Sequence, residues 1–189
     1  MRERCTKIRS VLAAFALALP MNSAGDQLEL QALPDDDWRL VTDGVMGGVS
    51  QATLSTAQHA GERCTRLSGR VSTANNGGFV QMTLDLDHGA LEPARYDGVR
   101  FEVLGNGETY NVHLRTSDLW LPWQSYRATF DTQSEWRTIE LPFSAFARYR
   151  TLVGLRPERL RRIGIVAIGR EFEADLCIRN PALFRYRPG

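Results

Sequence analysis

The sequence lacks the features that mark most enzymes, metal proteins and nucleic-acid-binding proteins. Its 189 residues include three histidines and three cysteines, and none of these forms a CxxC pair or a histidine pair at metal-ligand spacing. No histidine accompanies a nucleophile or a pair of carboxylates, as general acid–base chemistry requires. The formal net charge of +1 gives no reason to expect nucleic acid as a partner. We therefore predict a protein without catalytic activity, metal or cofactor.

Hydrophobic runs of membrane-spanning length are also missing. The N-terminal run, Val11–Leu19, is about half of the ~20 residues that a membrane span needs. It follows a basic head at residues 2–9 and ends in small residues near Ala24, a pattern typical of a secretory signal peptide. A buried N-terminal helix and a mitochondrial presequence are the alternatives. We predict a signal peptide over residues 1–24, export to the periplasm, and no transmembrane anchor after cleavage.

Two cysteines, Cys64 and Cys177, would remain after cleavage. An oxidising compartment favours a disulfide between them. Such a bridge would close a loop of more than a hundred residues, for which chain entropy gives about 4–5 kcal/mol of stabilisation. The alternative is two separate buried thiols.

Beyond residue 25 the sequence contains no helix of convincing length. Short segments instead alternate apolar and polar residues and are separated by Gly, Asn, Asp and Pro. Segment 162–168 is apolar almost throughout, which predicts a strand buried on both faces. Strands are predicted at 63–71, 79–86, 98–104, 110–115, 126–130, 136–141, 162–168, 173–178 and 182–184. Short helical turns are predicted within 142–149 and 157–160. This order predicts one all-β domain over residues 25–189, an antiparallel sandwich or jelly roll.

A Gly-Asn-Gly sequence at residues 105–107 lies between two of these predicted strands. Such a sequence is typical of a tight turn, so we expect a hairpin between segments 98–104 and 110–115. The histidine in the second of these segments, His113, has the opposite parity to its apolar neighbours, and we expect it to be exposed or to face a sheet edge.

Two glycine-rich stretches, DGVMGGVS at residues 43–50 and NNGGF at residues 75–79, are not ordinary turns. Neither is a phosphate-binding loop, because the expected helix and lysine are missing. Glycines permit positive φ or close backbone approach, so both loops can be structural, with Met46 as a packed plug. The glycines concerned are Gly44, Gly47, Gly48, Gly77 and Gly78. In the alternative interpretation the loops form one wall of a ligand or partner site that includes Asp43, Met46, Asn75 and Asn76.

Aromatic residues concentrate in the segment SDLWLPWQSY, residues 117–126. Trp120, Trp123 and Tyr126, with Arg115 and Gln124, are candidates for a stacking surface with hydrogen-bonding neighbours. Such a surface suits a sugar or a protein partner. In the alternative interpretation Trp123 and Tyr126 belong to the core and only Trp120 is exposed.

Taken in order, these motifs resemble the complex I intermediate-associated protein 30 family over nearly all of the chain beyond the signal peptide. The resemblance is carried by Trp38, DGVMGGVS (43–50), SGRVS (68–72), NNGGF (75–79), YDG (96–98), GNGETY (105–110), WQSY (123–126), Trp136 and LPFSAF (141–146). It implies a galactose-binding-like jelly roll and a founding role in the assembly of respiratory complex I in mitochondria. An exported member would lie across the membrane from the matrix side, so the resemblance transfers the fold more directly than the assembly role.

Two functional hypotheses follow. The first is a non-catalytic exported binding protein with a protein partner, which acts as an assembly or adaptor factor for an envelope or respiratory complex. The second is a carbohydrate-binding module that recognises an envelope or extracellular glycan with one surface, formed by the Trp120–Tyr126 segment, Arg115 and the two glycine-rich stretches.

Overall fold

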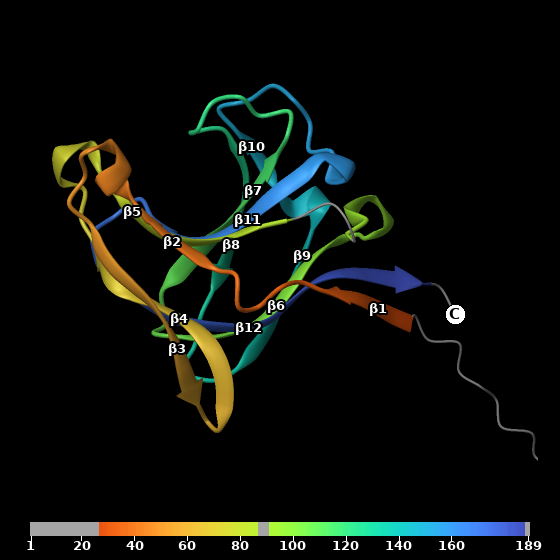
Figure 1. The fold of residues 1–189 in the computed structure, drawn as a ribbon, viewed down its shortest axis with the longest axis horizontal. Coiled ribbons are helices and arrows are strands. Elements are labelled where there is room, and N and C mark those ends of the chain that lie inside the picture. Colours follow the sequence, from red (N-terminus) through yellow and green to blue (C-terminus); the bar gives the residue numbers. More distant parts are fainter. Residues whose placement is uncertain (1–26, 87–90, 188–189) are drawn as a thin grey trace, which may run out of the picture.

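The protein is an all-β sandwich of two antiparallel sheets with six strands each (Figure 1). The structure, a computed structural model, describes residues 27–86 and 91–187, so the predicted signal peptide lies outside the described residues. The fold class predicted from sequence alternation is confirmed. Within the described ranges, no helix is long and apolar enough to cross a membrane.

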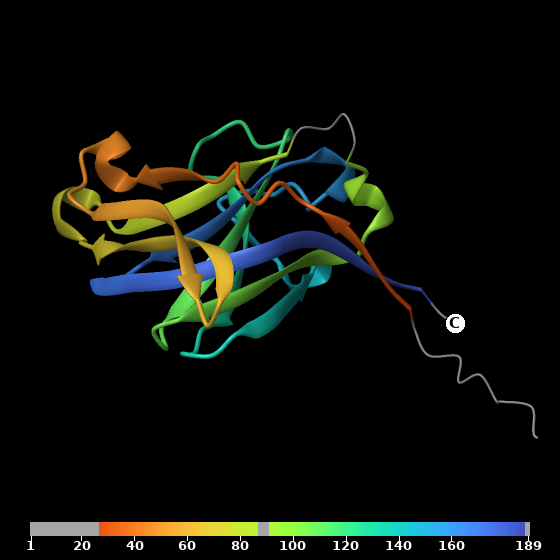
Figure 2. The same cartoon turned by 60° about the horizontal axis from the view of Figure 1, so that its bottom comes forward.

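The first sheet, sheet A, is organised around the long strand β12 (Phe172–Arg187). Its strand order is β3 (Gln51–His59), β4 (Glu62–Val71), β12, β6 (Gly98–Gly105) and β9 (Arg137–Pro142). β1 (Gln27–Ala32) pairs with the C-terminal half of β12, and Figure 2 shows the two strands side by side. An irregularity between Arg179 and Ala182 separates the two halves of β12, which explains why the sequence predicts two strands there.

The second sheet, sheet B, carries the candidate site. Its strand order is β10 (Ala147–Tyr149), β8 (Ser125–Asp131), β7 (Thr109–Thr116), β11 (Leu160–Ile168), β5 (Phe79–Asp85) and β2 (Arg39–Thr42). The centre of β11, residues 163–167, is buried, as its continuous apolar sequence predicts.

In the part of the chain that the structure describes, five short 3-10 helices connect the strands. They are η1 (Asp43–Met46), η2 (Ala74–Asn76), η3 (Pro93–Arg95), η4 (Phe143–Ala145) and η5 (Pro157–Arg159). Helical turns therefore lie within both predicted segments, 142–149 and 157–160, but residues 147–149 form strand β10 instead.

The predicted hairpin at Gly105–Gly107 is wrong. β6 belongs to sheet A and β7 to sheet B, so this segment crosses from one sheet to the other. The Gly105 amide donates to the carbonyl of Gln133, and the Asn106 side chain donates to the carbonyl of Glu173 over 2.7 Å. Gln133 lies in the loop between β8 and β9, and Glu173 lies in β12, so the segment is fixed by contacts that a local turn signal cannot reveal.

Aromatic packing and a hydrogen bond of one buried hydroxyl join the two sheets across the interior of the sandwich. Phe101 of sheet A and Phe130 of sheet B lie edge to face at 5.1 Å, and Tyr110 stacks near Phe130 at 6.0 Å. The Tyr110 hydroxyl accepts the backbone N–H of Asp175 in the opposite sheet over 2.9 Å. Burial raises the pKa of Tyr110 to about 12, so the hydroxyl keeps its proton and also donates to the Asn106 side chain over 2.8 Å.

Cys64 on β4 and Cys177 on β12 are joined by a disulfide, with their Cα atoms 5.6 Å apart. Both cysteines are buried and their strands are direct neighbours in sheet A. The bridge therefore joins residues 113 positions apart in the sequence across adjacent strands.

Candidate functional site

Asp43 connects the two glycine-rich stretches. It is fully buried at the start of η1, and its carboxylate accepts hydrogen bonds from both loops. The Ser50 amide donates to Oδ1 over 3.0 Å, and the Ser50 hydroxyl donates to Oδ2. The amides of Gly78 and Phe79 donate to Oδ2 over 2.6 and 3.3 Å. Burial acts to raise the pKa of Asp43, but these hydrogen bonds outweigh it, so the pKa lies below its ordinary value.

The carboxylate also explains two of the glycines. A Cβ atom at Gly48 would lie inside the van der Waals distance of the Asp43 carboxylate, and a Cβ at Gly77 would lie 2.5 Å from Oδ2. Gly47 and Gly78 have positive φ of 87° and 130°, a conformation that glycine adopts readily. The two motifs therefore build one buried junction, and the role of Asp43 is structural, because its carboxylate binds groups of both loops.

Met46, Asn75 and Gly44, the other described candidates in these loops, are exposed. Met46 is 63% exposed, so the prediction that it is a packed plug is wrong. Asn75 is exposed and has a φ of 55°, and Asn76 follows it in η2. Gly44 is exposed at the first turn of η1.

The other sequence candidates lie at the opposite end of sheet B. The glycine-rich junction adjoins Phe79, at the start of β5, which pairs with Ile168 at the end of β11. The aromatic loop, residues 117–124, follows Thr116, which pairs with Leu160 at the start of β11. The two groups are thus separated by the length of β5, about 20 Å for seven residues. The sequence predicts one combined surface, whereas the structure separates two.

Arg115 and Gln124 hold the aromatic loop in place. Arg115 donates from Nη1 to the carbonyls of Leu121, Pro122 and Gln124 over 3.1, 2.7 and 2.6 Å. The Gln124 side chain accepts the amides of Trp120 and Leu121 and donates to the carbonyl of Arg150 over 3.2 Å. These two candidates therefore position the loop and join it to its neighbour, the loop at residues 150–156.

The loop presents its two tryptophans to solvent. Trp120 is 90% exposed and Trp123 is 50% exposed, whereas Tyr126 is fully buried and donates its hydroxyl to the carbonyl of Gly154 over 3.0 Å. The alternative that placed both Trp123 and Tyr126 in the core therefore holds for Tyr126 alone. Figure 1 shows the loops at residues 117–124 and 150–156 next to each other, beyond β10 and β7.

The loop at residues 150–156 adds apolar side chains that the sequence analysis missed. Leu152 is 94% exposed and Val153 is 41% exposed, and Leu121 is exposed on the aromatic loop. We call these residues, with Trp120 and Trp123, the apolar patch. No periodic pattern marks residues 150–156, so only the pairing of β10 with β8 reveals that the two loops are neighbours.

Beside the patch lies the outer face of sheet B, which is polar. Across its central strands the register places Arg127, His113, Gly164 and Thr83 in one row. The His113 Nε2 and Thr83 Oγ1 atoms are buried and make no hydrogen bond within the described residues. Burial, reinforced by the charge of Arg127, lowers the pKa of His113 to about 3, so the imidazole is neutral.

The prediction that His113 is exposed or faces a sheet edge is therefore wrong. It is half-buried, and its strand β7 lies between β8 and β11. Its polar parity is nonetheless explained, because it faces the outer side of the sheet rather than the core.

An arginine stacked on a tyrosine forms the edge of this outer face. The Arg127 guanidinium carbon lies 3.3 Å from the centroid of the Tyr149 ring, and its Nε donates to the Ser125 hydroxyl over 3.0 Å. Burial lowers the pKa of Arg127; the nearby Arg150 lowers it further, while Tyr149 opposes the shift. The sequence analysis did not select Arg127 or Tyr149, because their contact depends on the pairing of β8 with β10.

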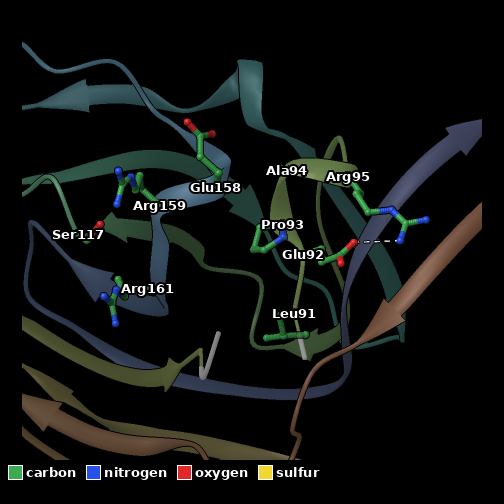
Figure 3. Close-up of a pocket in the computed structure, with 9 residues that line it drawn as sticks. All are labelled: Leu91, Glu92, Pro93, Ala94, Arg95, Ser117, Glu158, Arg159 and Arg161. Atoms are coloured by element: carbon green, nitrogen blue, oxygen red, sulfur yellow. Dashed lines mark hydrogen bonds and ion pairs between the residues drawn. The ribbon is translucent and has the colours of Figure 1, made fainter. Parts of the chain in front are cut away.

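A pocket of about 510 Å³ lies between η3 and η5 (Figure 3). Its nine lining residues are Leu91, Glu92, Pro93, Ala94, Arg95, Ser117, Glu158, Arg159 and Arg161. They include no aromatic ring and no histidine, and Arg95 is paired with Glu92. This lining offers neither a stacking surface nor a nucleophile–base pair, so we place the candidate site at the tryptophan loop instead. Among the described side chains, no group of three or more His, Cys, Asp or Glu is arranged to hold a metal ion.

Comparisons with known proteins agree with this architecture. The family described as Complex I intermediate-associated protein 30 (CIA30) matches residues 28–178. The search of curated protein sequences gives no match. Among solved structures, a family 11 carbohydrate-binding module from Clostridium thermocellum, in complex with a β-1,3-1,4-mixed-linked tetrasaccharide, superposes with a TM-score of 0.68. The identity is 15%, over 85% of this chain and 98% of the module.

A second solved relative is the family 30 carbohydrate-binding module of a cellulosomal cellulase from Clostridium thermocellum. It superposes with a TM-score of 0.59 at 11% identity, over 83% of this chain and 98% of the module. At these identities the likeness establishes the shared sandwich fold.

Proposed function

The chain belongs to the complex I intermediate-associated protein 30 (CIA30) family, and we propose that it is a non-catalytic binding protein that recognises a glycan at the tryptophan loop. The carrying observation is that Trp120 is 90% exposed in a loop whose backbone is fixed by Arg115 and Gln124. Aromatic side chains gain much free energy from burial, so a fixed and exposed pair of tryptophans is typical of a binding surface. A ligand would meet a prearranged platform, which lowers the entropic cost of binding.

The outer face of sheet B supplies the polar part of the proposed site. Arg127 and His113 lie on this face within three residues of the strand ends that carry the loop, and Asn111 lies two residues further from it on β7. Guanidinium, imidazole and amide groups donate or accept the hydrogen bonds that sugar hydroxyls require. Ligand sites commonly combine apolar surface with a few such polar groups. The solved neighbour bound to a mixed-linked tetrasaccharide has the same fold, which supports the class of ligand without identifying it.

The proposal is tested with a glycan array that includes a β-1,3-1,4-mixed-linked tetrasaccharide. We expect the purified protein to bind at least one glycan class, and Trp120→Ala to weaken that binding by about tenfold or more. Met46→Ala is the matched control, since Met46 is also an exposed apolar residue but lies at the opposite end of sheet B. A silent array would overturn the proposal, and loss of binding in Met46→Ala alone would move the site to the glycine-rich loops.

A protein partner is the second candidate function, and Leu152 and Val153 favour it. These side chains bring a second loop into the apolar patch, and exposed apolar surface of this kind is typical of protein interfaces. A pull-down from the envelope fraction that captures one stable protein, together with a silent glycan array, would select this candidate. Either function is proposed for the exported protein in the periplasm, on the basis of the predicted signal peptide.

A further inference from the structure

Positive charge is concentrated around the tryptophan loop. Residues 115–127 and 147–156 contain five arginines and a single acidic residue, Asp118. The whole chain, by contrast, has 23 basic and 22 acidic residues. Composition alone therefore does not produce this local excess.

The Asp118 carboxylate already forms an ion pair within the cluster. Arg156 binds Asp118 through Nε and Nη2, over 2.9 and 2.5 Å. Within the described residues, no carboxylate pairs with the other four arginines, Arg115, Arg127, Arg148 and Arg150. Arg115 and Arg148 are bound to loop carbonyls, which accept hydrogen bonds but do not neutralise charge.

Arg127 and Arg150 are the two cations best placed to meet a ligand. Both guanidinium groups lie over the Tyr149 ring, with their central carbons 3.3 and 5.4 Å from its centroid. The ring restricts the Arg127 group, and a guanidinium so oriented can bind a carboxylate or sulfate through two parallel hydrogen bonds. The Arg150 carbonyl accepts a hydrogen bond from the side chain of Gln124, the residue after Trp123, so the backbone of Arg150 lies beside the tryptophan loop.

These cations are held together at an electrostatic cost. Burial lowers the pKa of Arg127, and the charge of Arg150 lowers it further, although Tyr149 opposes the shift. An anionic ligand would relieve the repulsion among these groups, whereas a neutral ligand would leave it in place.

We infer that the glycan recognised at the tryptophan loop is acidic and carries carboxylate or sulfate groups that bind Arg127 and Arg150. This inference rests on the proposed glycan-binding function. It adds the class of ligand, because stacking on Trp120 and Trp123 suits any pyranose and only the arginines select for charge.

The experiment compares oligogalacturonate with its fully methyl-esterified form, which has the same sugar rings without the charge. A sulfated galactan oligosaccharide forms a parallel arm, to separate sulfate from carboxylate as the source of the charge. We expect an acidic oligosaccharide to bind at least about tenfold more tightly than its neutral counterpart, with the difference shrinking as salt rises from about 20 to 200 mM. Arg127→Gln should remove most of this preference. Arg137→Gln, on β9 of sheet A, should retain it.

Each outcome separates the inference from the function on which it rests. Equal binding of the acidic and neutral forms would overturn the inference and leave glycan binding intact. Failure of the array and of every oligosaccharide would overturn both. Binding to vesicles of anionic lipid without binding to any acidic oligosaccharide would also overturn the inference, in favour of a membrane surface. If Arg127→Gln does not fold, the exposed Arg150→Gln tests the same charge.

Discussion

The backbone amide of Gly78 donates a hydrogen bond of 2.6 Å to the carboxylate of Asp43, which lies 35 residues earlier in the chain. This bond joins the two motifs that are most unusual in the sequence, and both are explained by one buried acid. The glycine-rich loops therefore fix one end of sheet B, while the tryptophan loop presents a surface at the other.

Asp43→Ala should strongly destabilise the protein. The substitution leaves the amides of Ser50, Gly78 and Phe79 buried without their acceptor, and unpaired buried donors cost about 1–3 kcal/mol each. We expect a loss of about 3 kcal/mol or more in the free energy of unfolding, measured by urea denaturation. Asp36→Asn is the control, since its side chain is 79% exposed and its ion pair with Arg63 lies at the surface; it should change stability by less than about 0.5 kcal/mol. A small effect of Asp43→Ala would contradict the internal role of this carboxylate.

Gly48→Ala should destabilise the same junction by steric overlap. The added Cβ would collide with the Asp43 carboxylate, which four hydrogen bonds hold in place. Overlap of this kind costs typically about 1–3 kcal/mol. Gly154→Ala is the matched control, because a Cβ there has no neighbour within 4 Å. The melting temperature should fall for the first variant and remain close to wild type for the second; equal shifts would show that close packing at Gly48 is not the cause.

Arg115→Ala should loosen the tryptophan loop. It removes the donors that hold the carbonyls of Leu121, Pro122 and Gln124. Amide hydrogen exchange across residues 117–124 should become faster, with a stability loss of about 2 kcal/mol. Arg115→Lys should show nearly the same fast exchange as Arg115→Ala, since an ammonium cannot reproduce the guanidinium fork. Unchanged exchange in Arg115→Ala would mean that the loop is held by other contacts.

Stability should fall with acid because of His113. Its pKa is lowered to about 3 in the folded protein, while an unfolded histidine titrates near 6.5, at roughly its ordinary value. As the pH falls from about 6.5 towards 3, the unfolded state gains a proton that the folded state does not, so the free energy of unfolding decreases. Asp43, whose folded pKa is also lowered, adds to the loss only below about pH 4. His113→Asn should flatten the decrease between pH 6.5 and 4 in urea titrations; an unaltered slope would assign it to other groups.

Strand alternation predicted the fold class and most of the strands, because a half-buried strand imposes a period of two on its own sequence. The Gly105–Gly107 crossing was missed because its partners, Gln133 and Glu173, come from distant parts of the sequence. The short edge strands β2 and β10 also carry too few residues to show a period.

Only part of the candidate site is visible in the sequence. The aromatic content of residues 117–126 selected Trp120 and Trp123, but not Leu152 or the Arg127–Tyr149 stack. These join the site only through the pairing of β10 with β8, a long-range contact that has no local sequence signal. Asp43 was noticed as part of a motif, yet its burial depends on two loops meeting in space.

The most direct test uses the four tryptophans as internal probes. Trp120 and Trp123 are exposed in the proposed site, Trp38 is buried, and Trp136 donates its indole N–H to the carbonyl of His59 in sheet A. The indole N–H signals would be followed by NMR while the mixed-linked tetrasaccharide and oligogalacturonate are titrated separately. We predict that at least one of these ligands shifts the signals of Trp120 and Trp123 and leaves those of Trp38 and Trp136 in place. Shifts confined to Trp136, or saturable binding without any change at Trp120 and Trp123, would contradict the assignment of the site.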